Sequence, residues 1–293
     1  MTAAADAIAR LDARSPRAAL PFAAAALAFV VLFAQPAGLL ARDWWNDPEA
    51  GHGLLLAPLA VWLAWRSGRV RDARPAPVLG SALLVSAVLL RYVAGLAAEL
   101  FTLRFSMVLA LAGLATFWCG WRQLRRWWLP FALLTLSIPL PALVTNALAL
   151  PLQFKASAMG AALLEWRHVP VRLSGNVIQL PERQLFVTEA CSGLRSLTAL
   201  LSLGVLTGGL WLQRIPSRVV LVLLAIPVAI LLNAVRVFLT GFLVHFASPA
   251  LGEGFMHLTE GWLLFLVAFA LLGAAAWGLA HLERRVAGAP HAA

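Results

Sequence analysis

Long apolar stretches, each bounded by polar or basic segments, dominate the pattern of residues along the chain. A membrane-spanning helix needs about 20 predominantly apolar residues, and eight apolar stretches are interpreted as spans. They lie at residues 18–40, 53–65, 78–97, 103–120, 127–146, 190–211, 219–246 and 258–280. The pattern therefore predicts an all-α fold, a polytopic transmembrane helical bundle of about eight spans.

Residues 147–189 form a long segment between two predicted spans and carry a pattern of their own. Apolar residues recur at helical spacing over Pro151–Trp166, which predicts a helix lying along the membrane interface. Val169–Val187 alternates around Gly175-Asn176 and predicts a short β-hairpin. We expect this segment to form a small extracytoplasmic cap within a single domain over residues 1–293.

Basic residues indicate how the predicted spans are oriented. Every second loop holds a basic cluster, and the clusters comprise Arg10, Arg14, Arg17, Arg66, Arg69, Arg71, Arg74, Arg122, Arg125, Arg126, Arg214, Arg218, Arg284 and Arg285. Because Lys and Arg concentrate in cytoplasmic loops, both termini are expected in the cytoplasm. Tryptophans near the span ends, such as Trp44 and Trp45, fit an aromatic belt. No small-residue cleavage pattern follows the first stretch, so we expect an uncleaved span.

The composition excludes several classes of protein. Of the 293 residues, 61% are hydrophobic and 12% are charged, whereas a soluble domain carries about 25% charged residues. Two cysteines are too few for a disulfide scaffold. The excess of 23 Lys and Arg over 13 Asp and Glu belongs to the loop clusters, so no nucleic-acid partner is expected. Metal, phosphate-loop and dinucleotide motifs are not found in the sequence, and no metal or cofactor is expected.

Arg236 is the clearest candidate for chemistry, because an ionisable side chain at membrane depth is costly and usually functional. It lies in the outer half of its predicted span. Asn233, three residues earlier, and Thr240, four residues later, share its helical face. A structural role for Arg236, in which it pairs with a carboxylate or with backbone carbonyls, stays open. For Arg91, which lies nearer a span end, a structural or interfacial role is expected.

Cys191 opens the sixth predicted span on its outer side, within T-E-A-C-S-G at 188–193. With Thr188 as N-cap, Cys191 is the third helical residue, where the helix dipole and free N–H groups favour a thiolate. Arg195, one turn later, adds positive charge, so Cys191 is a candidate nucleophile. The alternative is a buried structural cysteine. Cys119, expected at the inner end of another span, is interpreted as a packing residue.

A thiol nucleophile needs a partner that transfers protons. His257 opens the last predicted span, across the loop that follows the span of Arg236, so the thiol, guanidinium and imidazole are expected at one membrane depth. His52 is a second candidate for proton transfer. Glu189 and Glu260 are candidates for tuning the histidine or binding substrate. The alternative for these histidines is a polar loop residue without a role in chemistry.

Three motifs at these positions resemble the exosortase/archaeosortase family of integral-membrane cysteine transpeptidases. They are E-A-C-S-G-L-R-S at 189–196, N-A-V-R-V at 233–237 and H-L-T-E-G-W at 257–262. The flanking sequences D-W-W at 43–45 and G-N-V-I at 175–178 are also similar to the family. The resemblance covers about residues 40–270.

The resemblance implies a Cys–Arg–His site made of Cys191, Arg236 and His257. In this interpretation the thiolate attacks a peptide carbonyl, the guanidinium stabilises the oxyanion, and the imidazole transfers protons. The supporting residues expected around it are Asn233, Ser192, Gly193, Arg195 and Glu189. Gly51 stands where the family commonly has a serine before the His-Gly pair, which leaves the role of His52 open.

The activity implied by the resemblance is that of a membrane-embedded cysteine protease or transpeptidase acting on exported proteins. Its substrates end in a sorting signal of the PEP-CTERM type, which comprises a short motif, one span and a basic tail. The expected partners are these proteins, the lipid bilayer and an unidentified amine acceptor. The expected location is the inner membrane, with the active site on the periplasmic side.

Two other classes of function stay open. A transporter or flippase would use Arg236 to bind an anionic substrate, although the internal repeats typical of transporters are not evident. A non-catalytic scaffold of a polysaccharide-export system would use none of the three side chains for chemistry. Replacing Cys191 by serine distinguishes an enzyme from a transporter, and replacing Arg236 by lysine distinguishes an enzyme from a scaffold.

Overall fold

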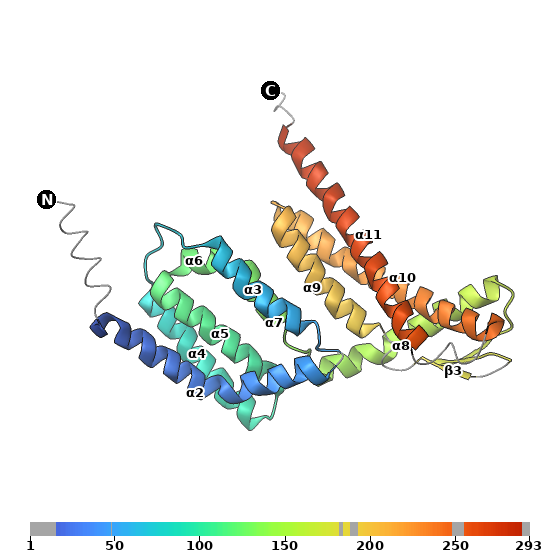
Figure 1. Cartoon of the computed structure of the whole chain (residues 1–293), viewed down its shortest axis with the longest axis horizontal. Helices are drawn as coiled ribbons and strands as arrows, with labels where there is room; N and C mark the ends of the chain where they lie inside the picture. The colour runs from blue at the N-terminus through green and yellow to red at the C-terminus, as the bar shows by residue number, and fades with distance from the viewer. Residues whose placement is uncertain (1–15, 48, 182–183, 188–192, 248–254, 289–293) are drawn as a thin grey trace. The chain divides into compact units, whose positions relative to one another are not determined.

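The computed structural model describes residues 16–47, 49–181, 184–187, 193–247 and 255–288, and it is predominantly helical (Figure 1). Its helices are α2 (Pro16–Asn46), α3 (Gly53–Ser67), α4 (Pro77–Leu96), α5 (Leu100–Cys119), α6 (Trp121–Arg126), α7 (Trp128–Leu136), α8 (Ala142–Trp166), α9 (Leu194–Trp211), α10 (Ile215–Phe246) and α11 (Phe255–Gly288). Three short strands, β1 (Arg172–Ser174), β2 (Val177–Gln179) and β3 (Gln184–Phe186), lie between α8 and α9 in the sequence.

Within the described ranges, seven helices are long and apolar enough to cross a membrane. They are α2, α4, α5, α8, α9, α10 and α11. The predicted all-α, polytopic fold class is therefore confirmed, and the chain is a multi-pass membrane protein. The predicted span at 53–65 corresponds to α3, an apolar helix of 15 residues that is shorter than these seven.

The prediction of one continuous span over residues 127–146 is wrong. α7 ends at Leu136, and α8 begins at Ala142. Pro139 and Pro141 lie in the break, and a proline pushes the residue before it out of the helical region. Pro141, the N-cap of α8, is itself extended, with ψ of 139°.

The helix predicted over Pro151–Trp166 is only the second part of α8, which has 25 residues. Pro151 lies inside α8, where it removes a backbone hydrogen bond without ending the helix. That this helix lies along the membrane interface stays a prediction, because its length and composition also suit a crossing.

The hairpin predicted within Val169–Val187 is confirmed. β1 and β2 pair antiparallel with Ser174 opposite Val177, so Gly175 and Asn176 form the turn. Gly175 has a φ of +62°, a conformation that residues with a side chain rarely adopt. β3, which the sequence pattern does not predict, adds a third strand by pairing antiparallel with β2.

Internal contacts divide the chain into two units. The first lies within residues 1–46 and 69–125 and holds α2, α4, α5 and all of α6 but its last residue, Arg126. α4 and α5 approach closely, since a Cβ added at Gly80 would lie 2.5 Å from Cα of Phe117. The buried core between α2, α4 and α5 contains Phe33, Ala87 and Ala110.

Arg91 makes its contacts within the first unit. Its Nε donates a hydrogen bond of 2.7 Å to the backbone oxygen of Leu32. Its guanidinium carbon lies 5.9 Å from the ring centroid of Phe33. Both contacts join α4 to α2. Of the two roles expected for Arg91, structural and interfacial, the geometry therefore favours the structural one.

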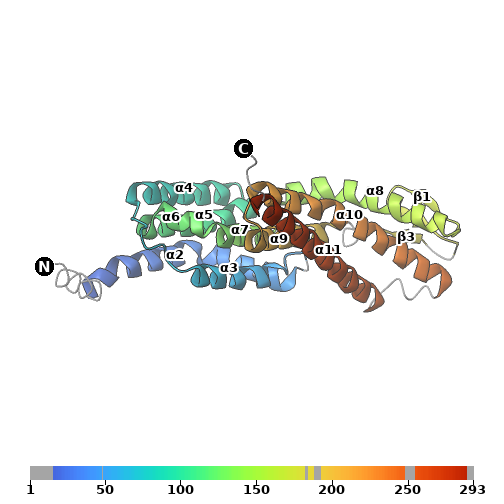
Figure 2. The same ribbon diagram turned by 90° about the horizontal axis from the view of Figure 1, so that it is seen from above.

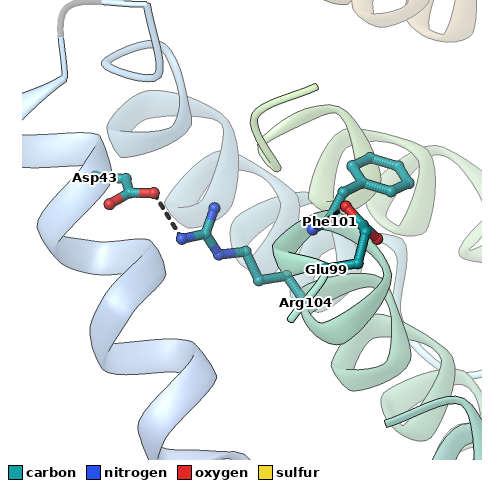
Figure 3. A network of polar contacts seen from close by, with 4 residues as sticks. All are labelled: Asp43, Glu99, Phe101 and Arg104. Atoms are coloured by element: carbon teal, nitrogen blue, oxygen red, sulfur yellow. Dashed lines mark hydrogen bonds and ion pairs between the residues drawn. The ribbon is translucent and has the colours of Figure 1, made fainter. Parts of the chain in front are cut away.

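A polar cluster joins the end of α2 to the start of α5 (Figure 3). Arg104 Nη2 donates to Asp43 Oδ2 at 2.6 Å, and the two side chains are 4% and 37% exposed. Glu99, the N-cap of α5, accepts hydrogen bonds from the backbone N–H groups of Phe101 and Thr102 at 3.0 and 2.6 Å. The cluster therefore connects two helices and caps one of them.

The hydrogen bonds at Glu99 stabilise its ionised form. Burial opposes the charge, but hydrogen bonds from the Thr102 side chain and from the backbone of Thr102 and Phe101, together with the charge of Arg104, outweigh it. The pKa of Glu99 is consequently lowered. The stabilisation is therefore present above the pKa of the unfolded carboxyl and is lost as the pH falls through the lowered pKa of the folded state.

We expect Asp43→Asn to destabilise the first unit by about 3 kcal/mol, because the buried Arg104 then lacks its counter-charge. The thermal unfolding midpoint in detergent is the measurement. A double variant with leucine at both positions should lose less stability than Asp43→Asn, since it buries no charge. An Asp43→Asn protein as stable as the wild type would contradict this assignment.

The second unit lies within residues 47–68 and 126–293 and holds α3, α7 to α11 and the small sheet. α9, α10 and α11 share a buried cluster that includes Leu200, Leu221 and Leu272. α3 packs on α7, and α7 packs on α9, so the three helices share one buried cluster. α8 lies beside α10 in both views of the molecule (Figures 1 and 2), and the sheet joins them in a separate buried cluster.

Candidate active site

α10 has two sets of neighbours. Over Leu221–Ala229 its buried residues belong to the cluster with α9 and α11. Over Val237–Val244 they belong to the cluster with α8 and the sheet. Asn233 and Arg236 therefore lie at the boundary between these two packed regions.

The lengths of α9 and α10 indicate the depth of this boundary. α10 has 32 residues and is about 48 Å long, which exceeds the hydrocarbon thickness of about 30 Å. α9 has 18 residues and is about 27 Å long. It runs antiparallel to α10, since Gly193 contacts Asn233 while Gly208 contacts Arg218 and Leu221. If α9 spans the hydrocarbon layer, Arg236 lies near the edge of that layer, and the part of α10 after Arg236 extends beyond the layer.

A small cavity opens at this boundary, where α9, α10 and α11 meet. Its volume is about 20 Å³, which is enough for a single water molecule. The residues that line it are Ser196, Leu200, Ala229, Leu232, Asn233, Arg236, Leu264, Phe265 and Ala268. Among these described residues, the polar groups are thus a hydroxyl, an amide and a guanidinium.

The helix geometry explains why these three polar side chains meet. Asn233 and Arg236 are three residues apart on one face of α10, and Ser196 lies in the first turn of α9. Asn233 is 5% exposed, and Arg236 is half-buried. Thr240, expected on the same face, donates its hydroxyl to the backbone oxygen of Arg236 at 3.0 Å. A guanidinium has five N–H donors and no acceptor, so this site suits an anionic oxygen.

The structure brings together part of the predicted site. Asn233 and Arg236 share the cavity, and Gly193 packs directly against Asn233. Ser196 is a site residue that the sequence interpretation missed, although it belongs to the motif at 189–196. The signal in the sequence was that Ser196 is four residues before Leu200, so the two side chains share one face of the helix. Leu200 is buried, which indicates that this face points inward.

Several predicted site residues cannot be placed from the structure. Cys191, Ser192 and Glu189 lie outside the described residues. His257 and Glu260 belong to α11, but their side chains are outside the described part of the structure. Their proposed roles therefore stay predictions.

The prediction that Thr188 is the N-cap of the helix in the sixth span is wrong. α9 begins at Leu194, and its N-cap is Gly193. Gly193 has a φ of +80°, which is incompatible with the interior of an α-helix. Arg195 is exposed.

His52, the second candidate for proton transfer, has both ring nitrogens next to backbone oxygens. Nδ1 lies 3.1 Å from the oxygen of Glu49, and Nε2 lies 3.1 Å from the oxygen of Leu136. A carbonyl oxygen only accepts hydrogen bonds, and a neutral imidazole has a single N–H. Both bonds therefore form together only with the imidazolium. This geometry favours a structural role, in which His52 connects the start of α3 to the end of α7.

We expect His52→Ala to lower the free energy of unfolding by about 1–2 kcal/mol, because the contact to α7 is lost. Thermal unfolding in detergent measures this loss. The activity per folded molecule should not change, because neither ring nitrogen is available to a substrate in this geometry. A variant that keeps its stability but loses activity would show that His52 has a role in the chemistry instead.

In the part of the chain that the structure describes, no three His, Cys, Asp or Glu side chains gather as a metal site. The fold and the charged junction define a polytopic helical membrane protein with a guanidinium at the meeting point of three helices. Residues 44–274 match the family described as transmembrane exosortase. The chain belongs to this family, which confirms the resemblance seen in the motifs. No curated protein and no solved structure matches the chain.

Proposed function

We propose that the chain is a membrane-embedded cysteine endopeptidase or transpeptidase that cleaves the C-terminal sorting signals of exported proteins. The signals are of the PEP-CTERM type, with a short motif, one membrane span and a basic tail. The observation that carries the proposal is the contact of Gly193 with Asn233. Gly193 follows Cys191 by two residues, and Asn233 precedes Arg236 by about one turn. This contact supports a thiol and a guanidinium that act on one peptide bond.

The proposed reaction begins when the thiolate of Cys191 attacks the scissile carbonyl carbon. Arg236 donates hydrogen bonds to the developing oxyanion, a contribution worth about 3–4 kcal/mol. The imidazolium of His257 gives its proton to the leaving amine, so the C–N bond breaks and a thioester remains on the enzyme. An amine acceptor or water then attacks the thioester, and His257 accepts the proton that this nucleophile loses.

We place the active site on the periplasmic side of the inner membrane, with both termini in the cytoplasm. Arg214 in the α9–α10 loop and Arg218 in the first turn of α10 favour the cytoplasmic side for this end of the two helices. The carboxylate of Glu283, near the end of α11, accepts hydrogen bonds from the backbone of Gln213 and Arg214 at 2.9 and 3.0 Å. The C-terminal end of α11 thus lies beside this basic loop, whereas Arg236 lies toward the other end of α10.

Counting the crossings gives the same orientation if α3 and α7 both cross the membrane and α8 does not. The number of crossings is then even, so both ends of the chain lie on the same side of the membrane. The two helices are antiparallel, because Trp127 Nε1 lies 3.0 Å from the oxygen of Ala64 while His52 contacts Leu136 at the other end. α8 packs with the sheet on the part of α10 after Arg236. Labelling of Lys155→Cys with a membrane-impermeant maleimide should occur from the periplasm, and labelling only from the cytoplasm would overturn this orientation.

Co-expression with an exported protein that carries such a signal tests the proposed function. The substrate should lose its span and tail in the presence of the chain. Mass spectrometry should then find a new C-terminus, which is a carboxylate after hydrolysis or an amide after transfer. A matched substrate with a replaced motif but an intact span and tail should stay full length. An unchanged mass of the first substrate would overturn the proposal.

A further inference from the structure

We propose that Gly193 and Asn233 are positioning residues whose direct contact sets the spacing between the segment of Cys191 and the guanidinium of Arg236. The inference rests on the proposed function and extends it to a specific requirement of the same site. The inference is based on the close steric contact between Gly193, the N-cap of α9, and the side chain of Asn233 on α10.

Two properties make glycine necessary at position 193. Its φ of +80° is in the left-handed region, which favours glycine. The residue is also buried, and an added Cβ would lie 2.8 Å from Cγ of Asn233 and 3.0 Å from both Cβ and Nδ2 of the same side chain. Real Cβ atoms essentially never show a contact of 2.8 Å, and contacts of 3.0 Å are tighter than nine in ten real ones. A methyl group at this position would therefore have to move either α9 or Asn233.

Asn233 has little room to move away. It is 5% exposed, and it lies on α10 between the residues that pack on α9 and α11 and those that pack on α8 and the sheet. The nearest atoms include its Cβ, which is fixed by the helix backbone. The start of α9 is consequently the part expected to shift. In the wild type, the bare backbone of Gly193 lets α9 approach α10 at this point.

Chain connectivity carries such a shift to the reacting groups. Cys191 precedes Gly193 by two residues, so their Cα atoms are at most about 7 Å apart. Arg236 follows Asn233 by three residues, a rise of about 4.5 Å along α10. A displacement of about 1 Å between catalytic groups can cost about 100-fold in rate. The contact therefore fixes the geometry of the chemistry as well as the packing of two helices.

The experiment compares Gly193→Ala with Gly175→Ala, each alone, and then tests Gly193→Ala in an Asn233→Ala background. Gly175 is a matched control, since its φ is +62° and the nearest atom to an added Cβ is Phe154 Cε1 at 3.7 Å. Both changes strain the backbone, but only Gly193→Ala overlaps a neighbour. The readouts are kcat and KM of signal cleavage and the rate of Cys191 alkylation by a maleimide, all in Cys119→Ser protein.

We expect Gly193→Ala to lower kcat by about 100-fold with little change in KM, and Gly175→Ala to stay near the wild-type value. Asn233→Ala removes Cγ and Nδ2 and leaves only the contact with Cβ at 3.0 Å, so adding Gly193→Ala in that background should lower kcat by much less than it does when Asn233 is present. The alkylation rate should follow the same pattern. Thermal unfolding of each variant shows whether it is folded before its rates are compared.

Equal effects of Gly193→Ala and Gly175→Ala would overturn the inference. An equal effect of Gly193→Ala with and without the Asn233 side chain would do the same. These outcomes differ from a failure of the proposed function, in which the wild type does not cleave the signal at all. In that case the alkylation rates alone still test the contact.

Discussion

Replacing Cys191 by alanine or by serine should reduce cleavage of the sorting signal by a factor of about 10⁴ or more, as expected for loss of a nucleophile. The alanine variant has no group that can carry the acyl intermediate. The serine variant keeps a similar shape, but its hydroxyl is a weak nucleophile unless a dedicated base activates it. Quantitative mass spectrometry of the substrate, with purified variants in detergent or liposomes, measures the loss.

The other cysteine supplies the matched control for this prediction. Cys119 is the last residue of α5, is half-buried and belongs to the first unit of the chain. Cys119→Ser should therefore cleave the signal at the wild-type rate. In wild-type enzyme stopped early in the reaction, an acylated peptide should map to Cys191 and should be released by hydroxylamine.

Cleavage by Cys191→Ser at the wild-type rate would refute the thiol mechanism. If the chain were instead a transporter, Cys191→Ser should keep its transport activity, because Arg236 can bind an anionic substrate without the sulfur. An active serine variant, together with uptake or flipping of a substrate, would support that class. The two outcomes are thus separated by a single substitution.

The hydrophobic pattern was sufficient to predict most of the fold, because burial in lipid requires long apolar helices and leaves few alternatives. It failed between residues 127 and 166, where α7 ends at Leu136 and α8 begins at Ala142. The break follows from Pro139 and Pro141, while Pro151 lies inside α8 without ending it. Hydropathy alone does not distinguish these prolines, since packing against neighbouring helices decides which one a helix tolerates.

Arg104 shows a second limit of reasoning from the sequence. By position it lies at the start of the predicted span over residues 103–120. In the structure Arg104 lies in α5, is almost fully buried and forms an ion pair with Asp43. The two residues are 61 positions apart, and no local pattern indicates such a long-range pair. An ion pair of this kind depends on how α2 and α5 pack, which is a property of the folded unit.

The start of α9 shows a third limit, in the candidate site itself. The sequence suggests Thr188 as a cap, because threonine is a common N-cap residue. Gly193 takes that place instead, because its missing side chain lets α9 pack against Asn233. Ser196, which lines the cavity, follows only once the correct start of the helix is known. Close approach of two helices is a tertiary effect that overrides a local preference.

The second large effect is expected for Arg236→Lys, which should lower kcat by about 10²–10³ while KM changes little. A lysine keeps the positive charge, but its ammonium is a point charge and cannot supply the planar fork of a guanidinium. The loss should therefore fall on the transition state, in which the oxyanion develops. Steady-state cleavage of a purified signal-bearing substrate by the variant measures both constants.

Arg104→Lys is the matched control for this change, because Arg104 is likewise an arginine within a helix long and apolar enough to cross the membrane, and its side chain is only 4% exposed. It should lower stability and leave kcat unchanged, since Arg104 bonds to Asp43 rather than lining the cavity at α9, α10 and α11. If Arg236→Lys instead cleaves the signal at the wild-type rate, the guanidinium is not the oxyanion donor. A scaffold that needs only a cation at this junction would show the same tolerance, so this substitution distinguishes a structural charge at Arg236 from a catalytic one.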